Sequence, residues 1–271
     1  MAEGSTVNIL YIGDIMAEPG IVVVEKLLPD LKREKSIDFV VSQAENVTAG
    51  KGMSLVDYER LKKAGVDAFT GGNHTVARPE LFPLLENPNE PVVGPANMHD
   101  CPGPGYKYIE SPQGRVLVVS LLGGIVGKQA DTPVDNPLQT IDRILARETI
   151  DNRCAVVINF HGDYSSEKLI IGHYLDGRAS LVVGDHWHVQ TADAQVLPKG
   201  TAHISDVGMC GSLDSSLGVT FGSVIPRWRD GLQTRNLIEE TGRMQFNAVL
   251  ASINSETGRA ESIVNIRKIV A

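Results

Sequence analysis

Residues 9–14 (ILYIGD) form a short apolar run that ends in an aspartate, and the same arrangement recurs along the chain. Apolar runs at residues 39–41, 68–69, 156–160 and 181–183 are also followed within a few residues by polar side chains. Ligand-bearing loops of open α/β sheets cluster at the carboxyl ends of strands. We therefore expect one site built from eight residues: Asp14, Glu45, Asn46, Asn73, His74, His161, His186 and His188.

Up to about residue 183, β-rich runs alternate with amphipathic stretches, which favours βαβ units and a layered α/β architecture. A helix is predicted over residues 54–64, where Ser54 and Asp57 have the spacing of a capping box and Gly65 ends the helix. A second is predicted over 137–147, with Asn136 as its cap and Pro137 in its first turn. A third is predicted over about 166–175.

Two further stretches of the chain are predicted to form strands. Residues 114–122 (GRVLVVSLL) are typical of a fully buried strand. Residues 245–253 and 260–269 flank a turn at 254–258 rich in Asn, Ser and Gly, which predicts an antiparallel hairpin and a second sheet region. With 271 residues and no linker composition, we expect a single domain over residues 8–271, preceded by an N-terminal extension over residues 1–7.

Composition narrows the class of protein. Hydrophobic residues make up 42% and charged residues 21%, as in soluble globular proteins. No apolar stretch approaches the roughly 20 residues that span a bilayer, and no secretory signal is visible, so we expect a cytoplasmic protein without a membrane partner. The net charge of −8 argues against a broad nucleic-acid-binding face. Three widely spaced cysteines predict reduced thiols and no zinc ribbon.

The eight polar side chains combine carboxylate, amide oxygen and imidazole. Such a mixture suits borderline divalent metals, namely manganese, iron or zinc. His186 and His188 are two residues apart, so in an extended segment both project to one side and Trp187 points away. The set therefore predicts a metal-dependent hydrolytic site.

At this point the chain resembles a known family. Residues 13–14 (GD), 71–74 (GGNH), 161–162 (HG) and 184–188 (GDHWH) resemble, in order, the motifs of calcineurin-like metallophosphoesterases. Residues 44–46 (AEN), 50–52 (GKG), 175–178 (LDGR) and 188–193 (HVQTAD) are similar to the bacterial YmdB-type branch. The resemblance covers residues 8–267 and implies a calcineurin-like fold, a two-sheet α/β sandwich flanked by helices.

The resemblance also implies roles for the eight residues. One metal ion would be held by Asp14, Glu45, Asn46 and His188. Glu45 would bridge to a second ion completed by Asn73, His161 and His186. His74 would be the catalytic residue, facing the scissile phosphate and protonating the leaving oxygen or neutralising its charge. The implied activity is a phosphodiesterase that hydrolyses cyclic nucleotides such as cyclic AMP through a metal-bridging hydroxide, with manganese or iron, or else zinc, as the two divalent metal ions.

Charge counting points to the same substrate class. Two divalent ions bring about +4, the carboxylates of Asp14 and Glu45 remove about 2 and a bridging hydroxide about 1, which leaves roughly +1. A singly charged phosphodiester matches that charge better than a polyphosphate does. The chain departs from the wider superfamily by lacking a histidine two residues after Asp14, by offering Glu45 where an aspartate is usual, and by carrying the bulky Trp187 between two histidines.

Several of these residues also have ordinary structural interpretations. Taken alone, Asp14 is as well explained as a helix cap, and Glu45 and Asn46 as turn formers. His161 and His203 both follow strand-like runs, and we assign His161 to the metal and His203 to the core. Arg178 and Asp193 are candidates for a charge pair that supports the metal loop.

Two other functions stay open from the sequence. One is a nucleotidase-type phosphomonoesterase with the same metals. The other is a regulatory metal- or nucleotide-binding protein with low turnover, which the missing histidine and Trp187 favour and His74 disfavours. The expected partner is a small phosphodiester, and a homo-oligomer is the base-rate expectation for a soluble protein.

Overall fold

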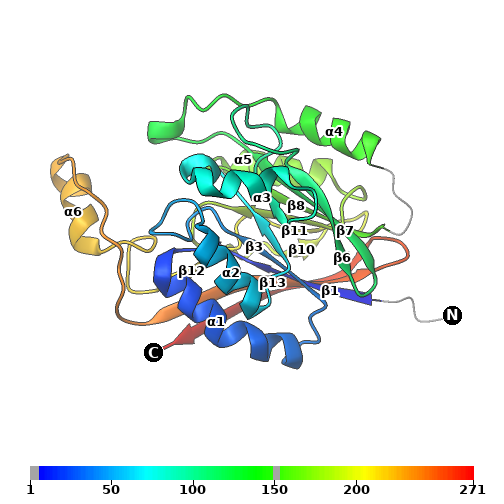
Figure 1. The fold of residues 1–271 in the computed structure, drawn as a ribbon, viewed down its shortest axis with the longest axis horizontal. Coiled ribbons are helices and arrows are strands. Elements are labelled where there is room, and N and C mark those ends of the chain that lie inside the picture. The colour runs from blue at the N-terminus through cyan, green and yellow to red at the C-terminus, as the bar shows by residue number, and fades with distance from the viewer. Residues whose placement is uncertain (1–5, 149–152) are drawn as a thin grey trace.

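The computed structural model describes residues 6–148 and 153–271. Two β-sheets face each other in the middle of the molecule, and helices cover their outer surfaces (Figure 1). Helices α1 (Ala17–Glu34) and α2 (Leu55–Ala64) cover one sheet, and α4 (Pro137–Arg147) and α5 (Ser165–Tyr174) cover the other. The predicted two-sheet α/β sandwich is therefore confirmed.

The first sheet has eight strands, in the order β2–β12–β13–β1–β3–β4–β5, and β14 also pairs with β13. Its β1, β3, β4 and β5 run parallel, as βαβ units require. The strands are β1 (Thr6–Ile12), β2 (Asp14–Ile15), β3 (Phe39–Gln43), β4 (Ala68–Thr70), β5 (Val92–Val93), β12 (Met209–Ser212), β13 (Met244–Asn254) and β14 (Ala260–Val270).

The second sheet has six strands, in the order β10–β11–β9–β8–β7–β6. Its inner strands β7, β8, β9 and β11 are parallel, and β6 and β10 are antiparallel edges. The strands are β6 (Tyr106–Ser111), β7 (Gly114–Leu122), β8 (Arg153–His161), β9 (Leu181–Asp185), β10 (Gln195–Val196) and β11 (Ala202–Ile204).

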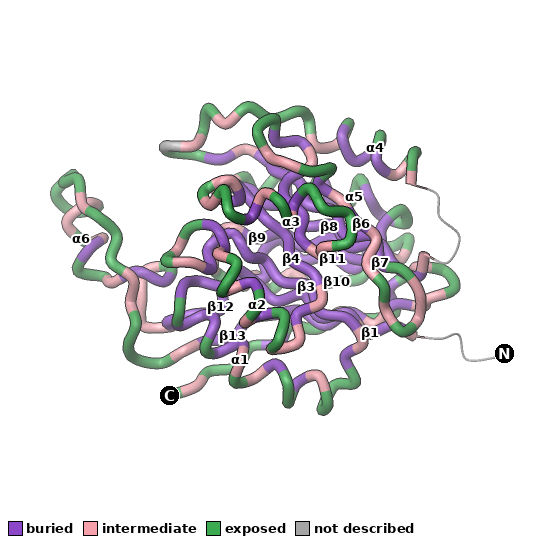
Figure 2. Tube along the Cα trace, viewed as in Figure 1, coloured by how far each residue is buried: buried purple, intermediate pink, exposed green. Residues whose placement is uncertain are grey.

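Alternating side chains of the central strands enter different cores. In β1, Ile9 and Tyr11 pack between the sheets, whereas Leu10 and Ile12 pack against the helices on the outer face. A third core lies between the second sheet and its helices. Because both faces of these strands are buried (Figure 2), their sequences are continuously apolar rather than alternating.

The predicted helices form close to their expected bounds. The Ser54 hydroxyl accepts a hydrogen bond from the Asp57 amide, and Gly65 ends α2 with a positive φ of 108°. Asn136 caps α4 by accepting from the amides of Leu138 and Gln139. The third helix, α5, begins one residue before its predicted start. Short helices η1 (Thr75–Ala77), η2 (Pro79–Leu81), α3 (Phe82–Glu86) and η3 (Gly127–Gln129) and the C-terminal α6 (Phe221–Asp230) were not predicted.

The C-terminal hairpin is observed, but its expected place is wrong. Strands β13 and β14 pair antiparallel, and Asn254 Oδ1 accepts amide hydrogen bonds within the turn. Instead of forming a separate sheet region, β13 inserts beside β1 in the first sheet, with Leu10 opposite Leu250. The hairpin thereby completes the sheet that carries the N-terminal strand.

At the N-terminus, β1 begins at Thr6 and Val7 is fully buried, so the ordered strand includes the last two residues of the predicted extension. Residues 1–5 lie outside the described part of the chain. Within residues 6–148 and 153–271, no helix is long and apolar enough to cross a lipid bilayer. The single-domain boundary at residue 8 stays a prediction.

The close approach of β9 and β11 gives a stability prediction. A Cβ on Gly184 would lie 1.9 Å from the carbonyl oxygen of Ser205. Gly184→Ala should therefore lower the free energy of unfolding by about 3 kcal/mol, because backbone must move to admit the methyl group. Urea denaturation measures the change. Gly222→Ala, where no atom lies within 4 Å, should leave stability unchanged or slightly higher. Equal stability of both variants would contradict the prediction.

Candidate metal centre

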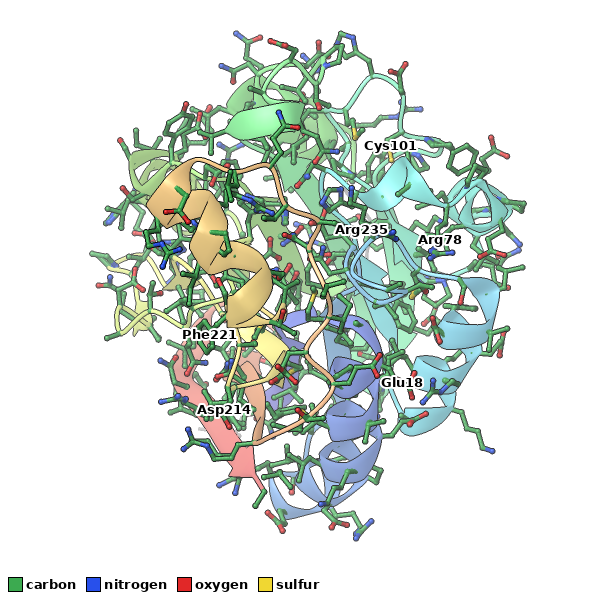
Figure 3. All side chains as sticks on the ribbon, turned by 90° about the vertical axis from the view of Figure 1, so that its left-hand side faces the viewer. Glu18, Arg78, Cys101, Asp214, Phe221 and Arg235 are labelled. Carbon is green, nitrogen blue, oxygen red and sulfur yellow. The ribbon has the colours of Figure 1, made fainter. Side chains whose placement is uncertain are left out.

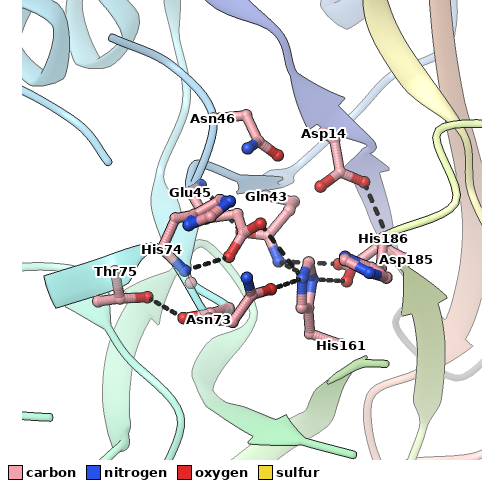
Figure 4. Close-up of polar contacts among 12 residues, drawn as sticks. Asp14, Gln43, Glu45, Asn46, Asn73, His74, Thr75, His161, Asp185 and His186 are labelled. Carbon is pink, nitrogen blue, oxygen red and sulfur yellow. Dashed lines mark hydrogen bonds and ion pairs between the residues drawn. The ribbon is translucent and has the colours of Figure 1, made fainter. Parts of the chain in front are cut away.

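The eight predicted residues lie together at one edge of the two sheets, and all of them except His188 are labelled in Figure 4. Asp14 begins β2, and Glu45 and Asn46 follow β3. Asn73 and His74 follow β4. From the second sheet, His161 ends β8, and His186 and His188 follow β9. The clustering expected from the strand ends is thus observed, although the role of each residue as a ligand stays a prediction.

One group of potential ligands surrounds His161. Its Nε2 lies 3.2 Å from Glu45 Oε1 and 2.7 Å from Asn73 Oδ1. His186 belongs to the same group, since one potential ligand atom each from Glu45, His161 and His186 lie within 4.8 Å of one another. Neighbouring atoms bound to one transition-metal ion are about 3 Å apart. The group therefore has the spacing of a coordination sphere.

A second group surrounds Asp14. Its Oδ1 lies 3.8 Å from His188 Nε2, which in turn lies 3.3 Å from Asn46 Oδ1. Asp14 is fully buried, and Oδ1 has no hydrogen-bond partner among the described residues. Burying a carboxylate oxygen without a partner is costly. A cation beside Oδ1 would remove this cost, so the residues fit a metal ion.

The electrostatics of these side chains also favour a cation. Burial lowers the pKa of His186 and of His188 to about 4, so both rings are neutral at pH 7 and keep a lone pair for a metal. Burial raises the pKa of Glu45, but His161 and His74 outweigh it and bring the pKa to about 2. Burial lowers the pKa of His161, whereas Glu45 and Asp185 raise it well above its usual value. The carboxylates of Glu45 and Asp185 thus make the surroundings of His161 attractive to positive charge.

The loop that carries the two histidines is not extended, contrary to our prediction. His186 and His188 have φ angles of 99° and 61°, which an extended segment does not contain. As a result Trp187 does not point away from the site but lines the same pocket. Its ring packs over Lys168 Nζ at 3.8 Å, and its Nε1 donates to the carbonyl oxygen of Asp163. Strained loop residues of this kind are typical of functional sites.

Asp185 is an important site residue that the sequence analysis missed. Its Oδ1 lies 2.6 Å from His161 Nδ1, and its Oδ2 accepts hydrogen bonds from Tyr11, Gln43 and Asn159. Asp185 also belongs to a second metal-capable set with Asp14 and His161. Because protein donors already occupy both of its oxygens, we assign Asp185 to orienting His161 rather than to binding metal.

The signal for Asp185 was present in the sequence. It follows the apolar run 181–183 as directly as Asp14 follows residues 9–12. A second missed residue, Asp163, places its Oδ2 3.2 Å from His186 Nε2. Both acids lie within two positions of a predicted histidine, so the pattern that selects the histidines also points to them.

Lys168 and Asp206 support the loop that carries His186 and His188 (residues 185–188). Lys168 is fully buried, and its ammonium donates to Asp206 Oδ2 at 2.7 Å and to the backbone oxygen of Asp185 at 2.6 Å. Asp206 Oδ2 also accepts the amide of Trp187. The ion pair therefore fixes the backbone on which the two histidines are carried.

The structure decides several of the ordinary interpretations. Met16, not Asp14, occupies the N-cap of α1, so the helix-cap interpretation of Asp14 is wrong. Buried His203 has its Nδ1 3.1 Å from the carbonyl oxygen of Val182, as a core histidine should. The proposed pair of Arg178 with Asp193 is also wrong, because Arg178 binds Asp142 on the surface.

A pocket of about 490 Å³ opens above the two groups. Part of its lining is polar and holds potential metal ligands and His74, and another part comes from residues 216–236, which include α6. The lining residues of the polar side are Glu45, Asn46, Lys51, His74, Asp163, His186, Trp187 and His188. A small molecule can therefore reach the candidate metal centre from solvent.

A family model for YmdB-like proteins matches residues 10–266. The chain belongs to the YmdB-like family. This YmdB-like protein is 38% identical over 261 residues to the 2',3'-cyclic-nucleotide 2'-phosphodiesterase of Bacillus subtilis, with 96% of each chain covered. The resemblance predicted from the motifs is confirmed, and the protein is a metallophosphoesterase.

Solved structures agree with this family assignment. A hypothetical protein from Thermus thermophilus superimposes on this YmdB-like protein with a TM-score of 0.88 and 36% identity, covering 98% of this chain and 100% of that one. A phosphatase from Mycoplasma pneumoniae superimposes with a TM-score of 0.90 and 27% identity, covering 98% and 94%. The fold is thus shared over essentially the whole described chain.

The Asp185 network gives a prediction that does not depend on metal. Asp185→Asn should lower the free energy of unfolding by about 3 kcal/mol or more, because it removes a buried charge that faces His161 and replaces one of the two acceptor oxygens with an NH2 group that cannot accept a hydrogen bond. Thermal or urea unfolding of the metal-free protein measures the change. Asp142→Asn, which breaks the exposed pair with Arg178, is the matched control and should cost less than about 1 kcal/mol. An equal loss of unfolding free energy in both variants would contradict the role assigned to Asp185.

Proposed function

We propose that this metallophosphoesterase is a binuclear metal-dependent phosphodiesterase that hydrolyses cyclic nucleotides or similar phosphodiesters. The observation that carries the proposal is the pair of ligand groups around Glu45. On one side, Asp14 offers a buried oxygen without a partner next to Asn46 and His188. On the other, Glu45 itself lies 3.2 Å from His161.

In this proposal Asp14, Glu45, Asn46 and His188 hold one ion, and Glu45, Asn73, His161 and His186 hold the second. Oxygen and imidazole donors without thiolate favour manganese or iron, with zinc as a further candidate. When bound, two such ions supply Lewis acidity to a phosphoryl oxygen and lower the pKa of water. Asn46 provides an amide ligand where the wider superfamily has a histidine after the first aspartate.

The chain's own residues contribute positioning and proton transfer. His74 lines the pocket, and its backbone amide donates to Glu45 Oε2 at 2.8 Å, which holds the His74 backbone beside the Glu45 carboxylate. Burial lowers the pKa of His74. A bound phosphate anion would raise that pKa again and favour the protonated ring, and we assign this ring to contact the scissile phosphate and to give a proton to the departing oxygen. Gln43 and Asp185 keep the His161 ring in place from the opposite side.

The substrate class follows from charge and from the relatives. The ligand set contains few carboxylates, which suits a substrate with a single negative charge. The Bacillus subtilis relative is named for a 2',3'-cyclic nucleotide. We therefore extend that class of substrate to this chain, with cyclic AMP isomers as the first compounds to test.

A comparison of substrates tests the diesterase assignment. Purified protein with manganese should cleave 2',3'-cyclic AMP and bis(p-nitrophenyl) phosphate at least about 10-fold faster than p-nitrophenyl phosphate, because a monoester dianion exceeds the charge that the site neutralises. Initial rates at equal substrate concentration give the ranking. The reverse ranking would show a nucleotidase-type phosphomonoesterase instead.

Two neighbouring substitutions separate metal binding from catalysis. Asn73→Ala should reduce the bound metal, measured by inductively coupled plasma mass spectrometry, because it removes an oxygen 2.7 Å from His161 Nε2. His74→Ala should bind metal as the wild type does, while kcat falls by about 100-fold or more. Circular dichroism serves as the folding control for both. Full activity and full metal content of Asn73→Ala would refute the ligand assignment.

A further inference from the structure

Helix α6 carries an apolar face that the fold leaves in solvent. Phe221, Ile225 and Trp228 recur with helical spacing and are 51%, 51% and 83% exposed. The helix stands out from the body of the molecule at the far side from α4 (Figure 1), and it lies in front of the sheets in the turned view (Figure 3). Exposed apolar patches of this kind often mark binding sites.

The apolar face is continuous with the pocket of the candidate metal centre. Trp228, Val224 and Ser216 line a hollow on α6 and also line the pocket that contains Glu45, His74 and His188. A molecule that places a phosphate near His74 can therefore place an apolar group against Trp228. The two adjoining spaces have volumes of about 470 and 490 Å³, within the range of small-molecule sites.

The helix is held in position by its own contacts. Arg227 Nη2 donates to Asn236 Oδ1 at 2.8 Å and to the carbonyl oxygen of Thr234 at 3.0 Å, and the Thr234 hydroxyl donates to the carbonyl oxygen of Ser223. Val224 packs against the cluster of Met16, Met209 and Val219 beneath it. Trp228 thus projects from an anchored helix, and Arg227 and Lys51 add positive charge to the pocket wall.

We propose that the α6 face binds the base of the nucleotide substrate, with Trp228 stacked on the ring. This inference rests on the proposed function and names the part of the site that selects nucleotides. A nucleotide has an anionic end and a flat aromatic end, as the pocket has a ligand-bearing end and an apolar end. Stacking on an aromatic side chain accepts any base, so Trp228 would distinguish nucleotides from other phosphodiesters rather than one base from another.

The test compares a nucleotide with an analogue that lacks the base. Trp228→Ala should raise KM for 2',3'-cyclic AMP about 10-fold, with kcat within about 2-fold, since one stacked base is lost. KM for 1-O-methylribose 2',3'-cyclic phosphate should not change. Trp228→Phe should restore most of the affinity for the nucleotide. Leu232→Ala, which removes an exposed apolar side chain outside both pockets, is the matched control and should behave as the wild type.

An equal rise of KM for both substrates, or no rise for the nucleotide, would overturn the proposal. Sedimentation of wild type and Trp228→Ala tests whether a second copy of the chain covers the face. Loss of a dimer in the variant together with equal effects on both substrates would assign the face to that contact.

Binding without turnover separates this inference from the proposed function. Titration of the metal-loaded protein with adenosine 3'-monophosphate, the product of hydrolysis at the 2' position, should quench tryptophan fluorescence, and Trp228→Phe should remove most of the quenching. If the wild type cleaves neither diester, the proposed function fails, and the quenching still decides the role of Trp228. Absence of quenching in the wild type would count against stacking.

Discussion

The carboxylate of Asp185 links the two sheets at the edge where the site lies. It stands on β9 of the second sheet and accepts hydrogen bonds from Tyr11 and Gln43, on β1 and β3 of the first. The same carboxylate contacts His161 at 2.6 Å. Because a buried charge needs all its partners, the position of each sheet relative to the other is coupled to the orientation of His161, and hence to the geometry of the whole candidate metal centre.

Three buried carboxyl groups lie around that link. Asp14, Glu45 and Asp185 are all buried within the same cluster, and burial together with Asp185 raises the pKa of Asp14 well above its usual value. Lys168 neutralises Asp206 next to the histidine loop and not the carboxylates at the centre. Cations bound between Asp14, Glu45 and His161 would favour the ionised form of these carboxyl groups and offset the cost of burying them. Metal binding would then stabilise the fold.

The strand ends could be predicted from the sequence because a buried parallel strand leaves a continuous apolar run, and the polar residue after it marks the sheet edge. Helices α2 and α4 could be predicted because their caps, Ser54 and Asn136, are local signals. The place of β13 could not, since pairing with β1 joins residues more than 230 positions apart. The positive φ angles of His186 and His188 could not be predicted for a similar reason. The loop is supported by the ion pair of Lys168 with Asp206, two residues that are far apart in the sequence.

The site has two parts: the candidate metal ligands at the strand ends, and the wall of the pocket that helix α6 forms. The candidate ligands lie at the ends of strands in two packed sheets, where a displacement of one side chain would disturb the shared network of Asp185. Helix α6 instead reaches the pocket from a segment between β12 and β13, anchored by Arg227 and Val224 and otherwise exposed. Substitutions on α6 would therefore change which organic group is bound without moving the candidate metal ligands. If both proposals hold, chemistry and substrate selection are carried by different elements, and changes in the α6 segment would alter the range of substrates without disturbing the sheets.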